Sequence, residues 1–494
     1  MISKFRSFWL VLAAAACSVL LAGCGDTFRQ FITPVPGPTG DPKALSHAVI
    51  TSTNPTATGL GSDMHVDVSG DSLAGVVTLG HNPLFFNSDQ GRAFIVNGDG
   101  TVSLYTGLLP LTTSVSTATL PPLTSGAVAA GAGNNGGIYI ANSGTNDVSF
   151  IPITTNAVTQ VMPVGLNPVM VAGGGNSAKI YVVNRGDNTV TVISTIDNTF
   201  QKTIPVGSSP VWAVMSSDGE AVFVVNQGDG TLSFIDTTLD REICGSGASI
   251  VPCTSTNRIH VGSTAGSSPN FAFYDSPRRR VYVTNTGENS VSLINADGIN
   301  FGVSPPVLPT KVKDIALSGA PTGVVALRDG TKAYAVLGGC PAGVNHITLI
   351  ASLPSCTGNR VSVISVVGLQ ESKVLVLPQI LPVPPTATGT FNGTVPIDAA
   401  ADSSRVYVVH ANDQISVPDT VHLIPNPPLV VRLGSVSVIR TDTDAELRNG
   451  DGTIKRFSVP QQDPACTPKA DPDNPSAGLL PCSLQIPFQV RVIP

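Results

Sequence analysis

The chain has 494 residues, of which 42% are hydrophobic and only 12% are charged. This balance excludes an intrinsically disordered chain, which combines few apolar residues with a high net charge. The 27 basic and 33 acidic residues give a net charge of −6, which excludes a basic nucleic-acid-binding protein. The 49 glycines and 40 prolines favour many turns and few long helices.

The chain begins with the pattern of an export signal. Lys4 and Arg6 precede an apolar run over 8–21, which is shorter than the ~20 residues that a membrane-spanning helix needs. The run ends in Leu-Ala-Gly-Cys24, which resembles the lipobox of bacterial lipoproteins. The resemblance implies that the signal (1–23) is removed and that Cys24 carries the lipid. An ordinary secretory signal is the alternative.

Gly25 stands where an Asp would retain a lipoprotein at the inner membrane. The resemblance therefore implies an outer-membrane lipoprotein of the cell envelope that faces the periplasm or the cell surface. Residues 24–45 are polar and rich in proline, which is typical of a semi-extended tether. We expect the lipid anchor, rather than surface charge, to hold the acidic mature chain at the membrane.

Cysteine spacing supports export. Six cysteines remain after Cys17 and Cys24, and they fall into three sequence-local couples. We predict the disulfides Cys244–Cys253, Cys340–Cys356 and Cys466–Cys482. Six cysteines allow fifteen pairings, and buried free thiols are the alternative. No couple has CxxC spacing, which argues against zinc or thioredoxin-like redox chemistry.

An internal repeat dominates the sequence. Its most regular part is a four-residue apolar string that ends in Asn, and a proline lies 16 residues before the last residue of four copies. A turn and an alternating strand follow each string. The strings are FIVN, YIAN, YVVN, FVVN, YVTN, YAVL and YVVH, which end at residues 97, 142, 184, 226, 285, 337 and 410. A repeat of about 40–45 residues with four short strands indicates a propeller blade.

These repeats resemble the YVTN family of β-propeller proteins over residues 46–460, with 206–236 the most complete copy. Leu337 and His410 depart from the pattern, because Asn is expected at both positions. The resemblance implies an all-β propeller of four-stranded antiparallel blades. It implies little about activity, since propellers serve many functions.

The strand count predicts seven complete units and a composite eighth blade. Residues 47–52, 63–70 and 74–80 read as the last three strands of a blade that lacks its first. In the C-terminal tail (461–494), residues 487–493 form an isolated strand pattern that can supply the missing strand. Closing the ring in this way protects sheet edges, and seven blades is the alternative.

Several local motifs have structural explanations. Residues 131–136 match GxGxxG, but a strand rather than a helix follows, so we predict a hairpin. The Arg-Gly-Asp at 185–187 occupies a turn of the repeat. The acidic stretch 442–451 permits a weak calcium site, although a solvated hairpin is the simpler interpretation. We predict no cofactor and no metal site, because the seven histidines form no ligand motif.

The repeated asparagines invite a functional interpretation as a ring of amides around a channel. Because they recur in most blades, we predict a structural role instead, as caps of the turn that follows each string. They are Asn97, Asn142, Asn184, Asn226 and Asn285.

Three functions stay open. We predict a monomeric, non-enzymatic binding or interaction scaffold whose partners are the membrane, through its anchor, and an envelope protein or glycan, with no nucleic acid. An enzyme, either a lactonase-like hydrolase or a quinone- or metal-dependent oxidoreductase, and a structural envelope component are the alternatives. No catalytic residue is assigned, because the sequence has no GxSxG, P-loop or SxxK motif.

Two insertions mark the expected binding rim. Residues 338–359 and 411–434 both lie between the second and third strands of neighbouring units, so we expect them to form a wall on one face. The insertion at 240–258 should lie on the opposite face. The rim candidates are Asn345, His346, Asn359, His410, His422 and Asn426.

Overall fold

Short antiparallel strands make up the chain, as the alternating apolar pattern predicts, and the described part contains almost no helix. The computed structural model describes residues 47–53, 60–68, 70–89, 92–105, 115–119, 127–133, 135–152, 154–174, 178–246, 249–300, 307–346, 348–349, 355–377, 395–402, 404–417, 429–450, 452, 454–458, 469–470, 479–480 and 486–493. All of them belong to one unit, Leu45–Pro494. The predicted disulfide between Cys466 and Cys482 and the tether lie outside these residues.

Seven sheets of four or five strands follow one another along the chain, and we number them blades II to VIII. In the two five-stranded sheets, two short strands share the last position of the blade. Blade II contains β4 (Pro83–Asp89), β5 (Arg92–Asn97), β6 (Thr101–Tyr105) and β7 (Val115–Thr119). Blade III contains β8 (Ala127–Ala132), β9 (Ile138–Asn142), β10 (Asp147–Ile151) and β11 (Gln160–Pro163). Blade IV contains β12 (Pro168–Ala172), β13 (Lys179–Asn184), β14 (Thr189–Ser194) and β15 (Phe200–Pro205).

Blade V contains β16 (Pro210–Met215), β17 (Ala221–Asn226), β18 (Thr231–Asp236), β19 (Arg241–Glu242) and β22 (Ile259–His260). Blade VI contains β23 (Pro269–Asp275), β24 (Arg280–Asn285), β25 (Ser290–Asn295) and β26 (Thr310–Ala316), with the 3-10 turns η1 (Ala265–Ser267) and η2 (Ser276–Arg278) at its first strand. Blade VII contains β27 (Gly323–Ala326), β28 (Lys332–Leu337), β29 (Arg360–Ser365) and β30 (Gln370–Val376). Blade VIII contains β31 (Val395–Ala401), β32 (Arg405–Val417), β33 (Leu429–Arg440), β34 (Ala445–Glu446) and β35 (Arg456–Ser458).

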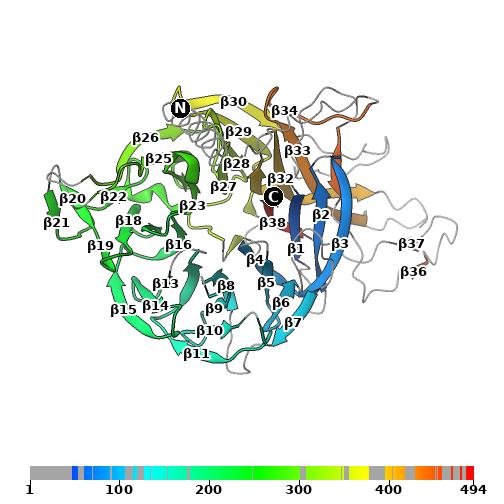
Figure 1. The fold of residues 1–494 in the computed structure, drawn as a ribbon. Coiled ribbons are helices and arrows are strands. Elements are labelled where there is room, and N and C mark those ends of the chain that lie inside the picture. Colours follow the sequence, from blue (N-terminus) through cyan, green and yellow to red (C-terminus); the bar gives the residue numbers. More distant parts are fainter. Residues whose placement is uncertain are drawn as a thin grey trace, which may run out of the picture. The chain divides into compact units, whose positions relative to one another are not determined.

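Blade I joins the two ends of the described chain, as the strand count predicts. Its strands are β38 (Ile486–Ile493), β1 (His47–Thr53), β2 (Leu60–Asp67) and β3 (Ser72–His81), paired in the order β3-β2-β1-β38. The register places Ile50 opposite Val490. Figure 1 shows the C-terminal strand β38 beside β1 in a ring of blades. The eight-bladed propeller with a composite blade is therefore confirmed.

The first strand of each blade lies innermost and contacts the first strand of the next. Blade I is tied into this inner ring on both sides, through β38 against β31 and β1 against β4. The side-chain oxygen of Gln489 accepts a hydrogen bond from the Phe86 backbone N–H at 2.7 Å. Asp398 of blade VIII accepts one from the Val490 N–H at 3.1 Å. The C-terminal strand thus joins its two neighbouring blades as well as completing its own.

The repeated asparagines clamp neighbouring strands within blades II to VI. The Asn226 Nδ2 donates to the Thr231 and Ser233 hydroxyls at 3.0 and 2.9 Å. The backbone N–H of Gly207 donates to the same Ser233 hydroxyl, and a Cβ at Gly207 would lie 2.4 Å from the Asn226 amide. The other four asparagines make equivalent pairs of bonds. The predicted structural role is confirmed, but the partners are side chains of the next strand rather than turn backbone.

A second repeated contact joins one blade to the next. In blade IV, Lys179 and the Tyr181 hydroxyl both bind the Asp240 carboxylate of blade V, at 2.6 and 2.8 Å. Asp240 lies in a left-handed turn with φ 46°, a conformation that Asp and Asn tolerate. We call this contact the seam latch. Blades VII and VIII are joined by the same contact through Lys332, Tyr334 and Asp444.

The ion-pair part of the seam latch recurs where the ring closes. Arg405 of blade VIII faces Asp71 of blade I at 3.5 Å, and both side chains are buried. Asp71 occupies the left-handed position of its turn, with φ 44°. The composite blade therefore shares the cation–carboxylate part of this contact, although its strands come from opposite ends of the sequence.

The insertions of blades V and VIII either interrupt a strand of the blade or extend two of its strands beyond the sheet. In blade V, β19 and β22 both pair with β18, so residues 243–258 form an insertion within the last strand. It carries the hairpin of β20 (Cys244–Ser246) and β21 (Ser249–Val251). In blade VIII, β32 and β33 continue their pairing to Val417 and Leu429, which makes a long hairpin. A short hairpin of β36 (Lys469–Ala470) and β37 (Leu479–Leu480) lies in the tail.

Candidate functional site

The candidate site is a cavity at the centre of the ring. Its walls come from the innermost strands of blades I, II, V, VI and VIII, which surround the axis. The free space between these side chains, counted out to the opening, is about 610 Å³. We call it the axial cavity.

The repeat itself positions the aromatic side chains of the axial cavity. In several inner strands a bulge follows the repeat proline, and the residue two positions after the proline contributes to the cavity wall. These residues are Phe85, Trp212 and Phe271, with Asp398 at the same position in blade VIII. The Trp212 ring centroid lies 4.9 Å from that of Phe271 and 6.3 Å from that of Phe85. Trp212 also donates from Nε1 to the Ala272 carbonyl at 3.1 Å, which fixes its ring.

The closing strand adds the polar part of the axial cavity. Phe488, Gln489 and Arg491 of β38 all line it. Arg491 Nη1 binds Asp398 Oδ2 at 2.9 Å and the Val490 carbonyl at 2.7 Å. The Arg491 side chain is 30% exposed, whereas that of Asp398 is 13% exposed. The cation is thus the more open member of the pair.

We call residues 338–359 the strap, and its described part folds inward and contributes to the axial cavity. The Gly343 N–H donates to the Ser268 hydroxyl of the segment leading into blade VI at 2.8 Å. Asn345 Nδ2 donates to Gln227 Oε1 of blade V at 3.0 Å. His346 Nε2 lies 3.3 Å from the Val169 carbonyl of blade IV. The strap therefore starts in blade VII and reaches the other side of the ring.

His346 is held as a neutral ring in the axial cavity. Its centroid lies 4.6 Å from that of Trp212 in an edge-to-face arrangement. Burial lowers the pKa of His346 to about 4, which keeps the imidazole uncharged at neutral pH. Nε2 then donates to the Val169 carbonyl, and the aromatic wall continues onto the strap.

The structure separates the six predicted rim residues. Asn345 and His346 line the axial cavity on the strap, rather than standing on a projecting wall. Asn359 lies at the base of the strap, where its carbonyl accepts the Leu377 N–H at 2.9 Å. His410 is buried inside blade VIII and binds the Ser437 hydroxyl at 2.7 Å, so it takes the place of the repeat asparagine. His422 and Asn426 lie outside the described residues.

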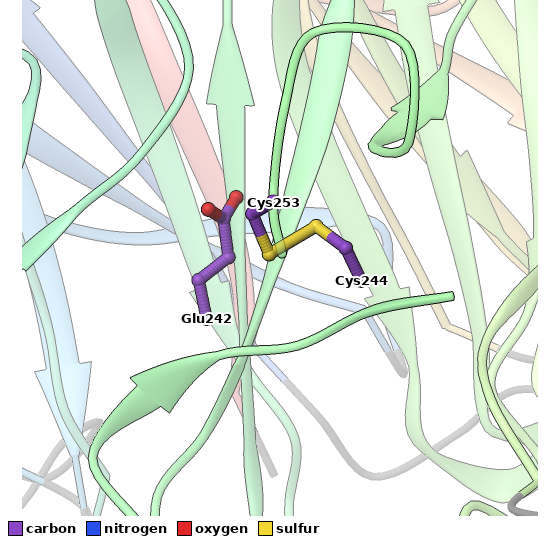
Figure 2. Close-up of side chains that lie close together, drawn as sticks. All are labelled: Glu242, Cys244 and Cys253. Atoms are coloured by element: carbon purple, nitrogen blue, oxygen red, sulfur yellow. A yellow bond between two sulfur atoms is a disulfide. The ribbon is translucent and has the colours of Figure 1, made fainter. Parts of the chain in front are cut away.

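Two predicted disulfides are confirmed. Cys340–Cys356 ties the two ends of the strap, and Cys244–Cys253 closes the insertion of blade V. Figure 2 shows Glu242 beside the second disulfide, a grouping that resembles a metal centre. Metal binding requires thiolates, which the disulfide removes, and both Glu242 oxygens bind Arg258, at 2.7 and 2.9 Å. In this state the group is a structural element.

The acidic stretch at 442–451 is divided among separate partners. Asp442 pairs with Arg440, Asp444 with Lys332, and Glu446 with Arg456. Their carboxylates thus face cations in different places rather than converging on one point. Asp451 lies outside the described residues. These contacts fit the simpler interpretation of a solvated hairpin.

A buried titratable group lies at the seam between blades I and II. Tyr105 of β6 donates to Asp63 Oδ2 of β2 at 2.7 Å, and His65 Nε2 lies 3.0 Å from the Tyr105 oxygen. Burial raises the pKa of Asp63 to about 7 and lowers that of His65 to about 4. At neutral pH this seam therefore holds a carboxyl group close to its titration point.

We expect Asp63→Asn to stabilise the protein at alkaline pH. Because the folded-state pKa of Asp63 is raised, the contribution of this carboxyl group to the free energy of unfolding is present at low pH. That contribution is lost as the pH rises towards about 7. The free energy of unfolding of the variant relative to wild type should rise by roughly 2–4 kcal/mol between pH 4 and pH 8. Urea unfolding at both pH values measures it. If the free energies of unfolding of variant and wild type differ by the same amount at pH 4 and pH 8, the raised pKa is contradicted.

In the described part of the chain, no helix is long and apolar enough to span a bilayer. No family model matches the sequence. No curated protein matches it either.

Solved structures match the fold. One is the dihydro-haem d1 dehydrogenase NirN in complex with DHE, at 11% identity and a TM-score of 0.53, covering 84% of this chain and 73% of that one. Another is apo AztD from Citrobacter koseri, at 12% identity and a TM-score of 0.50, covering 91% of this chain and 98% of that one. At such low identity the likeness extends to the fold alone. The chain is an eight-bladed β-propeller.

Proposed function

We propose that the protein is a lipid-anchored envelope propeller of the YVTN type that binds a small ligand in its axial cavity and does not transform it. The observation that carries the binding part is the axial cavity itself, where blades far apart in sequence bring Phe85, Trp212 and Phe271 together. Aromatic walls with a few placed polar groups are typical of ligand sites. The strap disulfide reduces the conformational freedom that binding would otherwise remove.

The sequence supports the anchoring part. A basic start, an apolar run and Leu-Ala-Gly-Cys24 occur in the order of a lipoprotein signal. We expect Cys24→Ser to release the protein from membranes into the soluble periplasmic or culture fraction. Fractionation after a salt wash measures this, and a variant that stays with the membranes would overturn the anchor.

Trp212 provides a direct test of binding. The sequence holds two tryptophans, Trp212 and Trp9 of the predicted signal. In a full-length Trp9→Phe chain, Trp212 is the one tryptophan whether or not the signal is removed, so its emission reports the axial cavity alone. Small one-ring aromatic compounds should change its emission in a saturable way. Leu84→Tyr, at a half-buried lining position, should abolish that change by filling the cavity.

Leu166→Tyr is the matched control, because Leu166 is 54% exposed outside the axial cavity. It should bind as the parent chain does. The proposal fails if no compound gives a saturable change, or if Leu84→Tyr binds as well as the control.

A further inference from the structure

The axial cavity has a polarity that limits what it can hold. Its aromatic wall lies around Trp212, and its open charged group is the Arg491 guanidinium of the closing strand. Asp398, the nearby acid, already accepts the Val490 N–H at 3.1 Å and Arg491 Nη1 at 2.9 Å. A cationic ligand would have to compete with both donors for this carboxylate.

Arg491 retains donors for a further partner. A guanidinium carries five N–H groups. Among the described residues, both side-chain contacts of Arg491 are made by Nη1. A planar carboxylate fits the remaining face, because guanidinium and carboxylate form paired, charge-assisted hydrogen bonds. The neutral His346 adds no competing charge at neutral pH.

We infer that the axial cavity takes a small aromatic carboxylate, with its carboxylate on the Arg491 guanidinium and its ring against Trp212 and Phe271. This rests on the proposed function and names the ligand class for the same cavity. The two ends of such a ligand match groups supplied by different parts of the chain: the inner strands of blades V and VI, and the C-terminal strand. Arg491 is then the residue that determines specificity for an anion.

Phenylacetate and phenylacetamide form a suitable probe pair, because they share a ring and differ in charge. In the full-length Trp9→Phe chain we expect phenylacetate to bind about tenfold more tightly, measured by Trp212 emission. Arg491→Gln should bring the ratio of the two dissociation constants close to one, and Arg491→Lys should retain part of the preference. Arg360→Gln, at the exposed start of β29, should keep the full ratio.

A second variant separates ligand binding from damage to the ion pair. Arg491→Gln leaves Asp398 without its cation, whereas Asp398→Asn with Arg491→Gln leaves no unpaired charge. Both should lose the preference for the acid. The inference is overturned if phenylacetamide binds as tightly as phenylacetate, or if the ratio survives in the double variant; binding of both probes would still support the cavity. If neither probe binds, the proposed function fails as well.

Discussion

A chain that ends at Gln485, before the closing strand, should lose cooperative unfolding or unfold at much lower urea concentration. The deletion removes Phe488 and Val490 from the core and breaks the bonds of Gln489 to Phe86 and of Asp398 to Val490. We expect a loss of about 5 kcal/mol or more in the free energy of unfolding. It also exposes the edge of β1 to association. Urea unfolding and size-exclusion chromatography measure both effects.

Rescue in trans is the control for the truncation. A peptide of residues 485–494 should restore part of the lost stability in a concentration-dependent way, because it can pair with β1 as β38 does. A shuffled peptide of the same composition should not. A truncated chain with the unfolding midpoint of the full chain would contradict the composite blade.

Asp71→Ala should be the most damaging single substitution at a seam latch. It removes the carboxylate that faces the buried Arg405 guanidinium, and breaking a buried ion pair typically costs about 3–5 kcal/mol. The matched change in an interior seam, Asp240→Ala, should cost less, about 1–2 kcal/mol, because Lys179 and Asp240 are 28% and 17% exposed. Urea unfolding of the two variants under one condition gives the comparison.

The second-site variant distinguishes charge burial from lost packing. Adding Arg405→Met to Asp71→Ala removes the buried cation as well and should recover much of the stability, since apolar groups can replace buried ion pairs at little cost. A double variant as unstable as Asp71→Ala alone, or equal effects of Asp71→Ala and Asp240→Ala, would show that the closing seam is not held by this pair.

Much of the fold could be predicted because the repeat encodes it locally. Five blades each carry their own asparagine clamp, and the bonds of Asn226 reach only five and seven residues along the chain. The composite blade could be predicted by counting strands. Three strands near the N-terminus formed a blade without its first strand, and one strand near the C-terminus had no partner. Two of the three predicted disulfides are confirmed, and they could be predicted because each couple of cysteines lies within one insertion.

The axial cavity was harder to predict, although part of its signal is in the repeat. The position two residues after each repeat proline identifies Phe85, Trp212 and Phe271, and comparing the blades at that position would have found them. The strap was different. Its length marks an insertion, but its inward direction depends on Ser268 and Gln227, which lie 75 and 118 residues from their partners. Such contacts leave no local pattern in the sequence.

The most direct measurement is the side-chain indole resonance of Trp212 in the ¹⁵N-labelled, full-length Trp9→Phe chain, titrated with phenylacetate. This chain has one tryptophan, so one indole N–H signal reports the axial cavity. The proposed binding predicts a saturable shift of that signal, with the dissociation constant found by fluorescence and no shift in Leu84→Tyr. Ligand binding in the axial cavity would be contradicted if the signal does not move although calorimetry detects phenylacetate binding. It would also be contradicted if the signal moves equally in Leu84→Tyr.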